Sequence, residues 1–212
     1  MLRKQDEFAG KTQPVRQGSL KYARAAAIAA LPVMFAAVLA TTAVASSQGC
    51  LECPPPYTPP PCGFVTSGGF VFNDAGKEVN FGAHGGCKNG EFWGSVNLVD
   101  HSTGYHLNAL EVTGFFNPTG DPNVRDICGS ATTNTADPQP VYFHIRLTDN
   151  GEPGVADTFG IRTSNGYVLS PRLLAAGRKG GGNVQLHEPN PSTTSPNPMP
   201  DEATMCNNVE AP

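Results

Sequence analysis

Charged residues are scarce in this sequence, at 15% of 212 residues, and long apolar stripes at helical spacing are missing. A helical bundle needs such a stripe over several turns, and no stretch sustains the pattern beyond two turns. Glycine (24 residues) and proline (20 residues) are instead well above average usage, which is typical of short strands joined by many turns. The apolar fraction is ordinary for one packed core, so the composition predicts a folded, strand-rich domain.

Motifs that identify common enzymes are also missing. The sequence holds no GxSxG nucleophile elbow, no HExxH zinc motif and no phosphate-binding P-loop. A pair of carboxylic acids for glycoside hydrolysis stays open, because their separation is set by the fold rather than by the sequence. We therefore expect a non-enzymatic domain, with a secreted hydrolase or metal-dependent enzyme as the alternative.

The N-terminal segment, residues 1–45, has the three parts of a signal peptide. An uncharged run over residues 25–45 ends in Ala43-Val44-Ala45, an A-x-A cleavage pattern. A retained membrane anchor is the alternative, because 21 apolar residues are long enough to span a bilayer. Lipidation at Cys50 is a third reading, although the residues before it lack the usual leucine. The positive charges that precede the run are Arg3, Lys4, Lys11, Arg16, Lys21 and Arg24.

Cleavage would leave an acidic chain. Residues 46–212 carry 8 Lys+Arg against 16 Asp+Glu, a formal net charge of −8. An acidic chain without a basic stripe is a poor partner for nucleic acid or for an anionic membrane surface. We therefore predict an extracytoplasmic protein that binds no nucleic acid and meets a membrane only through its N-terminal segment.

All six cysteines follow the cleavage pattern, as expected for up to three disulfides in an oxidising compartment. Cys87 and Cys128 are the two that lie well inside the folded region, and we predict that they pair. Cys50-x-x-Cys53 is interpreted as structural, because no second CxxC accompanies it. Cys206 finds a partner only if the C-terminal tail folds back to Cys62 or to another cysteine of the spacer.

The chain after the signal divides into three parts. Residues 46–62 form a Cys/Pro-rich spacer, expected to be extended because proline fixes φ. Residues 188–212 form a Pro/Ser/Thr-rich tail, expected to be disordered. Residues 63–187 form the β domain. Strand patterns recur in it at 63–72, 78–84, 92–100, 105–116, 124–131, 141–149, 157–163, 167–170 and 183–187.

The strand at residues 141–149 shows the alternation most clearly. Val141, Phe143, Ile145 and Leu147 lie on one face and polar residues on the other, which predicts one buried face. About nine such strands in one domain predict an all-β fold, either an antiparallel β-sandwich or a flattened barrel.

An ordered set of motifs in this region resembles the post-COAP type of domain, which occurs in secreted bacterial proteins. The resemblance covers nearly all of residues 63–187, and it implies a secreted β domain without implying an activity. The sequence departs from the pattern at residues 131–140, where a longer loop replaces a short Asn-Gly hairpin. The motifs lie at residues 65–71, 79–86, 100–114, 148–161, 165–170 and 181–187, and the aspartate-rich turn and the final GNVQLH are the most specific.

The aspartate-rich turn, TDNGEPGVADTF at residues 148–159, has two interpretations. Asn150-Gly151 favours a hairpin turn, with Asp149 and Asp157 accepting hydrogen bonds from backbone amides at the two ends of the loop. Alternatively, Asp149, Asn150, Glu152 and Asp157 supply about half of the oxygen ligands that calcium requires. We favour the turn and keep calcium as a candidate cofactor.

Two further groups are candidate sites. His101 and His106 carry metal-binding imidazoles, but no third ligand is evident in the sequence.

Aromatic side chains exposed on one outer face of a β domain would suit a sugar ring. We therefore expect a domain for adhesion, envelope structure or ligand binding, whose partner is a carbohydrate or an envelope protein. The candidate aromatic residues are Phe92, Trp93, Tyr105, Phe115 and Phe116.

Overall fold

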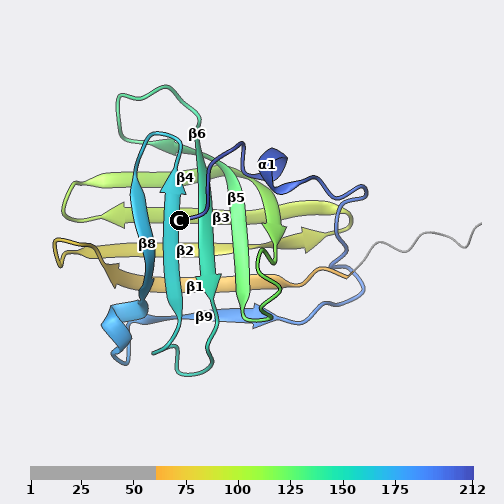
Figure 1. The fold of residues 1–212 in the computed structure, drawn as a ribbon, viewed down its shortest axis with the longest axis horizontal. Helices are drawn as coiled ribbons and strands as arrows, with labels where there is room; N and C mark the ends of the chain where they lie inside the picture. The colour runs from red at the N-terminus through yellow and green to blue at the C-terminus, as the bar shows by residue number, and fades with distance from the viewer. Residues whose placement is uncertain (1–60) are drawn as a thin grey trace, which may run out of the picture. The chain divides into compact units, whose positions relative to one another are not determined.

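The computed structural model describes residues 61–212, and the predictions for the signal peptide, Cys50 and Cys53 lie outside this part. Nine strands form one antiparallel sheet in the order β8-β7-β6-β5-β4-β3-β2-β1-β9 (Figure 1). The prediction of an all-β domain of about nine strands is therefore confirmed. The strands are β1 (Phe64–Phe72), β2 (Glu78–Lys88), β3 (Glu91–Asp100), β4 (Tyr105–Phe116), β5 (Val124–Thr133), β6 (Val141–Thr148), β7 (Thr158–Thr163), β8 (Val168–Leu173) and β9 (Gly182–His187).

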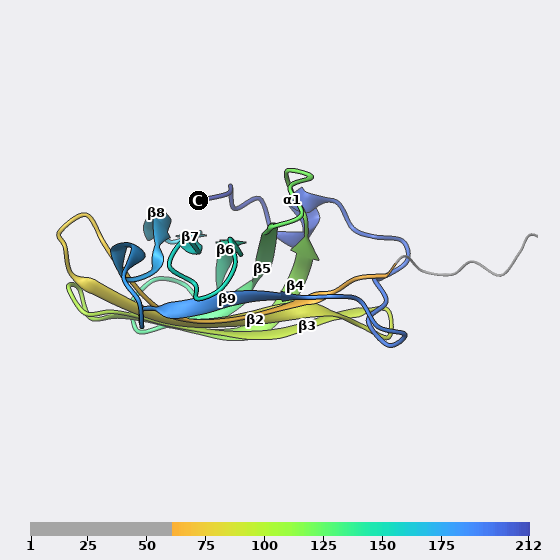
Figure 2. The same ribbon diagram turned by 90° about the horizontal axis from the view of Figure 1, so that it is seen from below.

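The sheet curls so strongly that its two halves face each other (Figure 2). Strands β9, β1, β2 and β3 form the first half, β5 to β8 form the second, and β4 belongs to both. Only Tyr105–Asn108 of β4 pairs with β3, whereas the pairing with β5 continues to Phe116. Register shifts at Ala109/Glu111 and Val112/Gly114 interrupt this second ladder. Such irregularities bend a strand, and they explain how β4 carries the sheet from one half to the other.

The hydrophobic core fills the space between the two halves. The rings of Phe81 in β2 and Phe159 in β7 stack with their centroids 3.9 Å apart. A Cβ atom on Gly85 of β2 would lie 3.2 Å from the side chain of Ile127 in β5, so the absence of a side chain at Gly85 lets the halves approach closely. Alternating residues of most strands point into this space, as the period of two predicts.

The two outermost strands, β8 and β9, do not pair with each other. Strand β8 contains Pro171, which has no backbone N–H to offer to another strand. Proline in an edge strand is one of the ordinary devices against edge-to-edge association. A short 3₁₀ turn, η1 (Leu174–Gly177), follows β8 and leads towards β9.

The C-terminal segment is ordered, so the prediction of a disordered tail at residues 188–212 is wrong. Cys62 donates its backbone N–H to the carbonyl oxygen of Thr193, and residues 202–205 form the short helix α1 (Glu202–Met205). Composition alone suggested disorder, but the tail is held by long-range contacts that composition cannot reveal. Neither helix among residues 61–212 has the length and hydrophobicity needed to span a membrane.

Two disulfides are present in the described chain, Cys62–Cys87 and Cys128–Cys206. The predicted pair Cys87–Cys128 is therefore wrong. Cys87 packs in the main core beside the start of β1, whereas Cys128 packs in a small second cluster with Met205 and Cys206. The alternation of β5 explains the difference, because Ile127 points into the core and its neighbour Cys128 points to the opposite face.

Candidate binding face and neighbouring sites

The aspartate-rich loop connects β6 to β7 and ties both to β9. Asp157 is fully buried, and its two carboxylate oxygens accept the backbone N–H groups of Asn150 and Val184, each at 2.8 Å. Asp149 accepts the N–H of Gly151 at 3.0 Å and that of Leu186 at 2.8 Å. The interpretation that these two aspartates fix the ends of the loop is thus confirmed.

The remaining candidate calcium ligands of this loop also make hydrogen bonds. Asn150 donates its side-chain amide to the carbonyl oxygen of Ala156 at 2.7 Å. Glu152 accepts the side-chain amide of Asn183 at 2.9 Å. The structure therefore gives each predicted ligand a role in the loop itself, and calcium binding stays a prediction.

The histidines predicted to bind metal lie at the turn between β3 and β4. His101 and His106 are both exposed, and neither belongs to a close group of three metal-ligating side chains within residues 61–212. The one such group found there combines His144 with Cys128 and Cys206. Because these two sulfurs form a disulfide, the group offers no thiolate to a metal.

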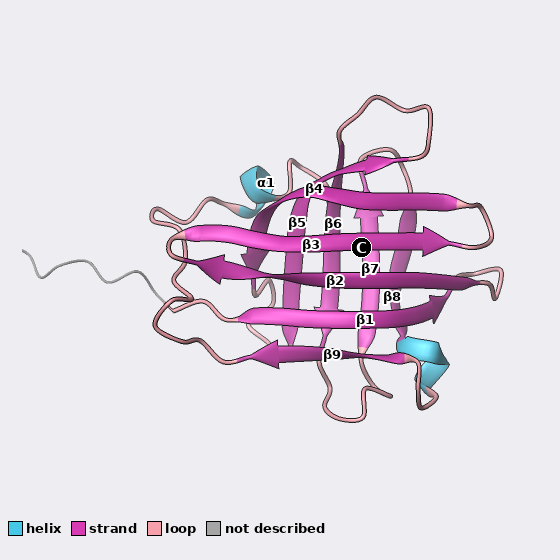
Figure 3. Ribbon diagram, turned by 180° about the vertical axis from the view of Figure 1, so that it is seen from behind, coloured by secondary structure: helices cyan, strands magenta, loops and turns pink. Residues whose placement is uncertain are grey.

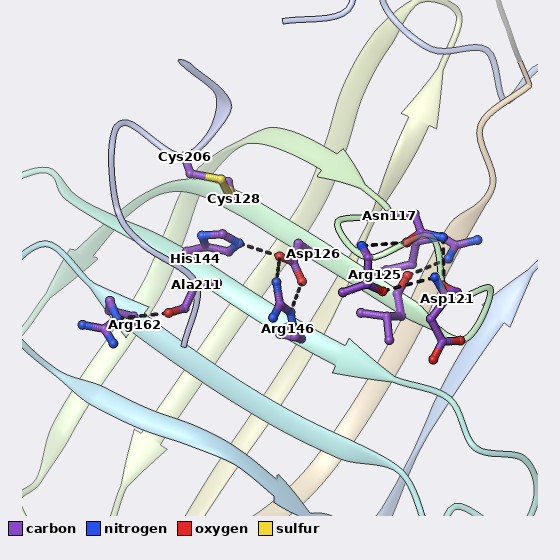
Figure 4. Close-up of polar contacts among 12 residues, drawn as sticks. Asn117, Asp121, Arg125, Asp126, Cys128, His144, Arg146, Arg162, Cys206 and Ala211 are labelled. Carbon is purple, nitrogen blue, oxygen red and sulfur yellow. Dashed lines mark hydrogen bonds and ion pairs between the residues drawn. A yellow bond between two sulfur atoms is a disulfide. The ribbon is translucent and has the colours of Figure 1, made fainter. Parts of the chain in front are cut away.

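A buried charged cluster lies on the side of β5 and β6 that points away from the main core, beneath the C-terminal segment (Figure 4). Asp126 accepts hydrogen bonds from Nε2 of His144 at 2.7 Å and from both Nε and Nη2 of Arg146. The other ring nitrogen of His144 lies 2.9 Å from the carbonyl oxygen of Val209. Hydrogen bonding to Asp126 raises the pKa of Arg146, so the cluster keeps a charged pair at this position.

The sequence does not predict this cluster. The alternation of β6 predicts a solvent face for its polar residues, but His144 is fully buried there, and so is Asp126 of the neighbouring β5. The C-terminal segment covers them, and the disulfide Cys128–Cys206 holds that segment in place. In the sequence, the presence of Cys206 in the C-terminal segment was the one indication that this segment folds back onto the domain.

The five candidate aromatic residues do not form one platform. Phe115 and Phe116 line a cavity at one end of the curled sheet, and Tyr105 lines a different pocket. Phe92 packs against the core. Trp93 alone of the five takes part in an aromatic row on the outer face of the first half.

This row crosses three neighbouring strands. Phe64 of β1 pairs in register with His187 of β9 on one side and with Gly86 of β2 on the other, and Gly86 in turn pairs with Trp93 of β3. The rings of Phe64 and His187 stack with their centroids 4.2 Å apart, and the ring of Trp93 lies 5.9 Å from that of Phe64. A Cβ atom on Gly86 would approach Cβ of Phe64 to 2.5 Å, so glycine makes room for the two flanking rings.

The same face continues along β1. Residues Phe70 and Phe72 point the same way as Phe64, because they alternate with the buried Val65 and Val71. We call this side of β9, β1, β2 and β3 the outer face. No other strand or helix of the described chain lies over it (Figure 3). Around its rings lie the exposed polar residues Thr66, Asn80, His84, Ser95, Asn97 and Gln185.

A second pocket, of about 400 Å³, lies at the opposite end of β3 and β4. The rings of Tyr105 and Tyr167 stack within it at 4.4 Å. Tyr105 donates its hydroxyl to Asn165, and Tyr167 donates its hydroxyl to Asp100. Burial raises the pKa of both tyrosines, and for Tyr167 the negative charge of Asp100 adds to the effect. These polar groups satisfy one another, which is typical of a structural network.

No family model matches the chain, and neither the curated proteins nor the solved structures contain a match. The resemblance to post-COAP domains therefore depends on the sequence motifs alone.

Proposed function

We propose that this protein is an exported, non-enzymatic β domain that binds carbohydrate through its outer face. The observation that carries the proposal is the row of Phe64, Trp93 and His187 across three strands of an uncovered sheet face. Each of the three rings is half-buried, so part of its surface contacts solvent. Aromatic rings in such a position match the apolar faces of sugar rings.

The chemistry around the row supports the same ligand. Exposed amide and hydroxyl groups, such as those of Asn97 and Gln185, are suited to sugar hydroxyls, and neither is charged. Phe70 lies six residues beyond Phe64 on β1, which corresponds to roughly 20 Å along the strand. A face with rings at both ends of that length suits a chain of several sugars better than a single one.

Export agrees with the covalent structure of the domain. Disulfides persist in oxidising compartments and are rare in the cytosol, and Cys62–Cys87 and Cys128–Cys206 both join distant segments. The apolar run at residues 25–45 and its A-x-A ending supply the targeting signal for that export. The alternative of a metal-dependent enzyme finds less support, because neither His101 nor His106 belongs to a close group of three metal-ligating side chains in the described chain.

Affinity electrophoresis in gels that contain one soluble polysaccharide each tests the proposal. We expect the protein to be retarded by at least one of β-glucan, xylan, galactomannan or dextran. Because Trp93 is the single tryptophan of the chain, its fluorescence should change on titration with oligosaccharides of the retarding polymer.

Two matched variants test whether the aromatic row is the carbohydrate-binding site. Phe64→Ala removes the central ring of the row and is expected to weaken binding about tenfold, because ring contacts contribute on the order of 1 kcal/mol beyond burial. Tyr142→Ala removes a half-buried ring from β6, on the other half of the sheet, and is expected to bind normally. Equal retardation of both variants would place binding elsewhere, and retardation by none of the polymers would contradict the proposal.

A further inference from the structure

A cavity of about 580 Å³ lies at the end of the curled sheet where β1 and β5 begin and β4 and β9 end. Its volume falls in the range of small-molecule sites, about 300–1,000 Å³. Both halves of the sheet contribute to its walls, which are largely apolar. The apolar residues that line it include Phe115, Phe116, Pro122, Leu186, Pro189 and Met199.

One cation lies among these apolar walls. Arg125 of β5 is paired in register with the buried Leu147 and precedes the core residue Ile127 by two positions. Alternation therefore directs its side chain to the core side of the strand, between the two halves. Burial lowers the pKa of Arg125, because the charged guanidinium is partly removed from water. An arginine at such a position normally has an anionic partner.

Arg125 has no such partner within ion-pair distance in the described chain. Its Nη1 donates to the carbonyl oxygens of Pro122 at 2.9 Å and Val124 at 2.6 Å, which fixes the guanidinium (Figure 4). Its Nε and Nη2 donate to no residue among 61–212. Arg146 of β6 differs from Arg125 in this respect. Its side chain lies on the opposite face of the strands, and it donates two hydrogen bonds to the carboxylate of Asp126. The free edge of the Arg125 guanidinium offers two parallel donors, which match a carboxylate.

One acid among residues 61–212 lies close enough to affect this cation. Glu188 also lines the cavity, and its charge acts to raise the pKa of Arg125, but no ion pair forms between them. Its carboxylate is exposed to solvent. Glu188 therefore competes weakly with an incoming anion.

From this geometry we propose that the cavity binds an amphipathic carboxylate, whose head group pairs with Arg125 and whose apolar body lies between Phe115 and Leu186. His187 of the aromatic row also lines this cavity, but Arg125, Phe115 and Leu186 lie outside the row, so this proposal does not depend on carbohydrate binding. It adds a second ligand, of a different chemical class, to the same domain.

Isothermal titration of the full-length protein with decanoate at neutral pH tests this site. We expect saturable binding, and weaker binding of decan-1-ol, which has the same chain without the charge. Arg125→Met, which keeps an apolar side chain of similar length, should weaken decanoate binding about tenfold or more, since a charge-assisted pair contributes on the order of 1.5–3 kcal/mol. Glu188→Gln should tighten it, because a competing negative charge is removed.

Controls separate a lost contact from a lost fold. Arg162→Met removes another half-buried arginine, away from the cavity, and should bind decanoate like the unmodified protein. Arg125→Lys keeps the charge if Arg125→Met fails to fold, and should bind more weakly because lysine lacks the paired donors. No saturable binding of decanoate, or equal binding by the Arg125 variants and the unmodified protein, would overturn the proposal. Neither result depends on whether the outer face binds carbohydrate.

Discussion

The buried carboxylate of Asp157 accepts the backbone N–H of Val184 at 2.8 Å, across 27 positions of sequence. Asp149 repeats this contact with Leu186, two residues further along β9. The N–H groups at Val184 and Leu186 lie on the edge of β9 that no strand covers. Unpaired edges invite association with other chains, so the two aspartates complete an edge that the open sheet would otherwise expose.

The first prediction concerns Asp157. Replacement by alanine leaves the N–H groups of Asn150 and Val184 without their acceptor in a buried position. We expect Asp157→Ala to lower the free energy of unfolding by about 3 kcal/mol, since hydrogen bonds to a charged group contribute on the order of 1.5–3 kcal/mol each. Unfolding in urea, followed by the fluorescence of Trp93, measures the change.

Glu152→Ala is the matched control for this loop. Glu152 is exposed and accepts one side-chain hydrogen bond from Asn183, so its loss should cost about 0.5 kcal/mol or less. If Asp157→Ala were no more destabilising than Glu152→Ala, the aspartate would not be what holds β9.

The second prediction concerns calcium. The carboxylate oxygens of Asp149 and Asp157 each accept a backbone N–H, so an ion at this loop would compete with those hydrogen bonds for the same oxygens. We therefore expect the same midpoint of thermal unfolding in chelator and in millimolar calcium. A bound ion would raise it, because a ligand at 100 times its Kd adds about 2.7 kcal/mol to the native state. A rise that Asp149→Ala abolishes would restore the calcium site.

The strands of this fold could be predicted from the sequence because alternation is a local property. The pattern at residues 105–116 has the bounds of β4, and the nine predicted strands all occur. The way in which the sheet curls could not be predicted, because it depends on the register shifts of β4 against β5. The shifts change the phase of burial in β4, so that Leu110 is exposed and Val112 is buried, and the sequence alone does not show where this change falls.

The sites were predicted less well than the strands, again for a physical reason. Phe64 and His187 are 123 positions apart, and only the pairing of β1 with β9 brings their rings together. The disulfide of Cys128 similarly depends on a tail that returns to the sheet. Asp149 and Asp157 could be placed correctly because the loop that they fix is local, although their bonds to β9 are not.

The third prediction concerns the disulfide Cys128–Cys206, which closes a separation of 78 residues. We expect the double variant Cys128→Ser/Cys206→Ser to lose about 2–4 kcal/mol of stability, because the unfolded chain regains conformational freedom. Limited proteolysis should then cut the C-terminal segment before the sheet, since few long-range hydrogen bonds remain near Cys206, namely those to the carbonyl oxygens of Met205, Val209 and Ala211.

Peptide mapping without reduction checks the pairing itself. It should recover Cys62 joined to Cys87 and Cys128 joined to Cys206. A peptide that joins Cys87 to Cys128 would contradict the structure. As a matched comparison, Cys62→Ser/Cys87→Ser should leave the C-terminal segment protected, because that disulfide fixes the start of β1.

The last prediction concerns pH and Asp100, whose side chain is almost fully buried. Burial acts to raise its pKa, but hydrogen bonds from Ser102, Tyr167 and Asn73 outweigh burial and bring the pKa below the ordinary value of 3.8. The unfolded state therefore binds the proton more readily than the folded state. The stability that Asp100 contributes is complete above about pH 4 and is lost as the pH falls through its lower, folded-state pKa.

Asp100→Asn tests this sign. The variant should be less stable than the unmodified protein near neutral pH, because its neutral amide accepts these hydrogen bonds more weakly. The difference in unfolding free energy should shrink as the pH is lowered below about 4, since Asp100 then binds a proton, first in the unfolded state and at lower pH in the folded state. Urea titrations of both proteins at a series of pH values measure that difference, and the other carboxylates cancel because both chains share them. A difference that stays constant down to the acid limit would mean that Asp100 keeps an ordinary pKa in the fold.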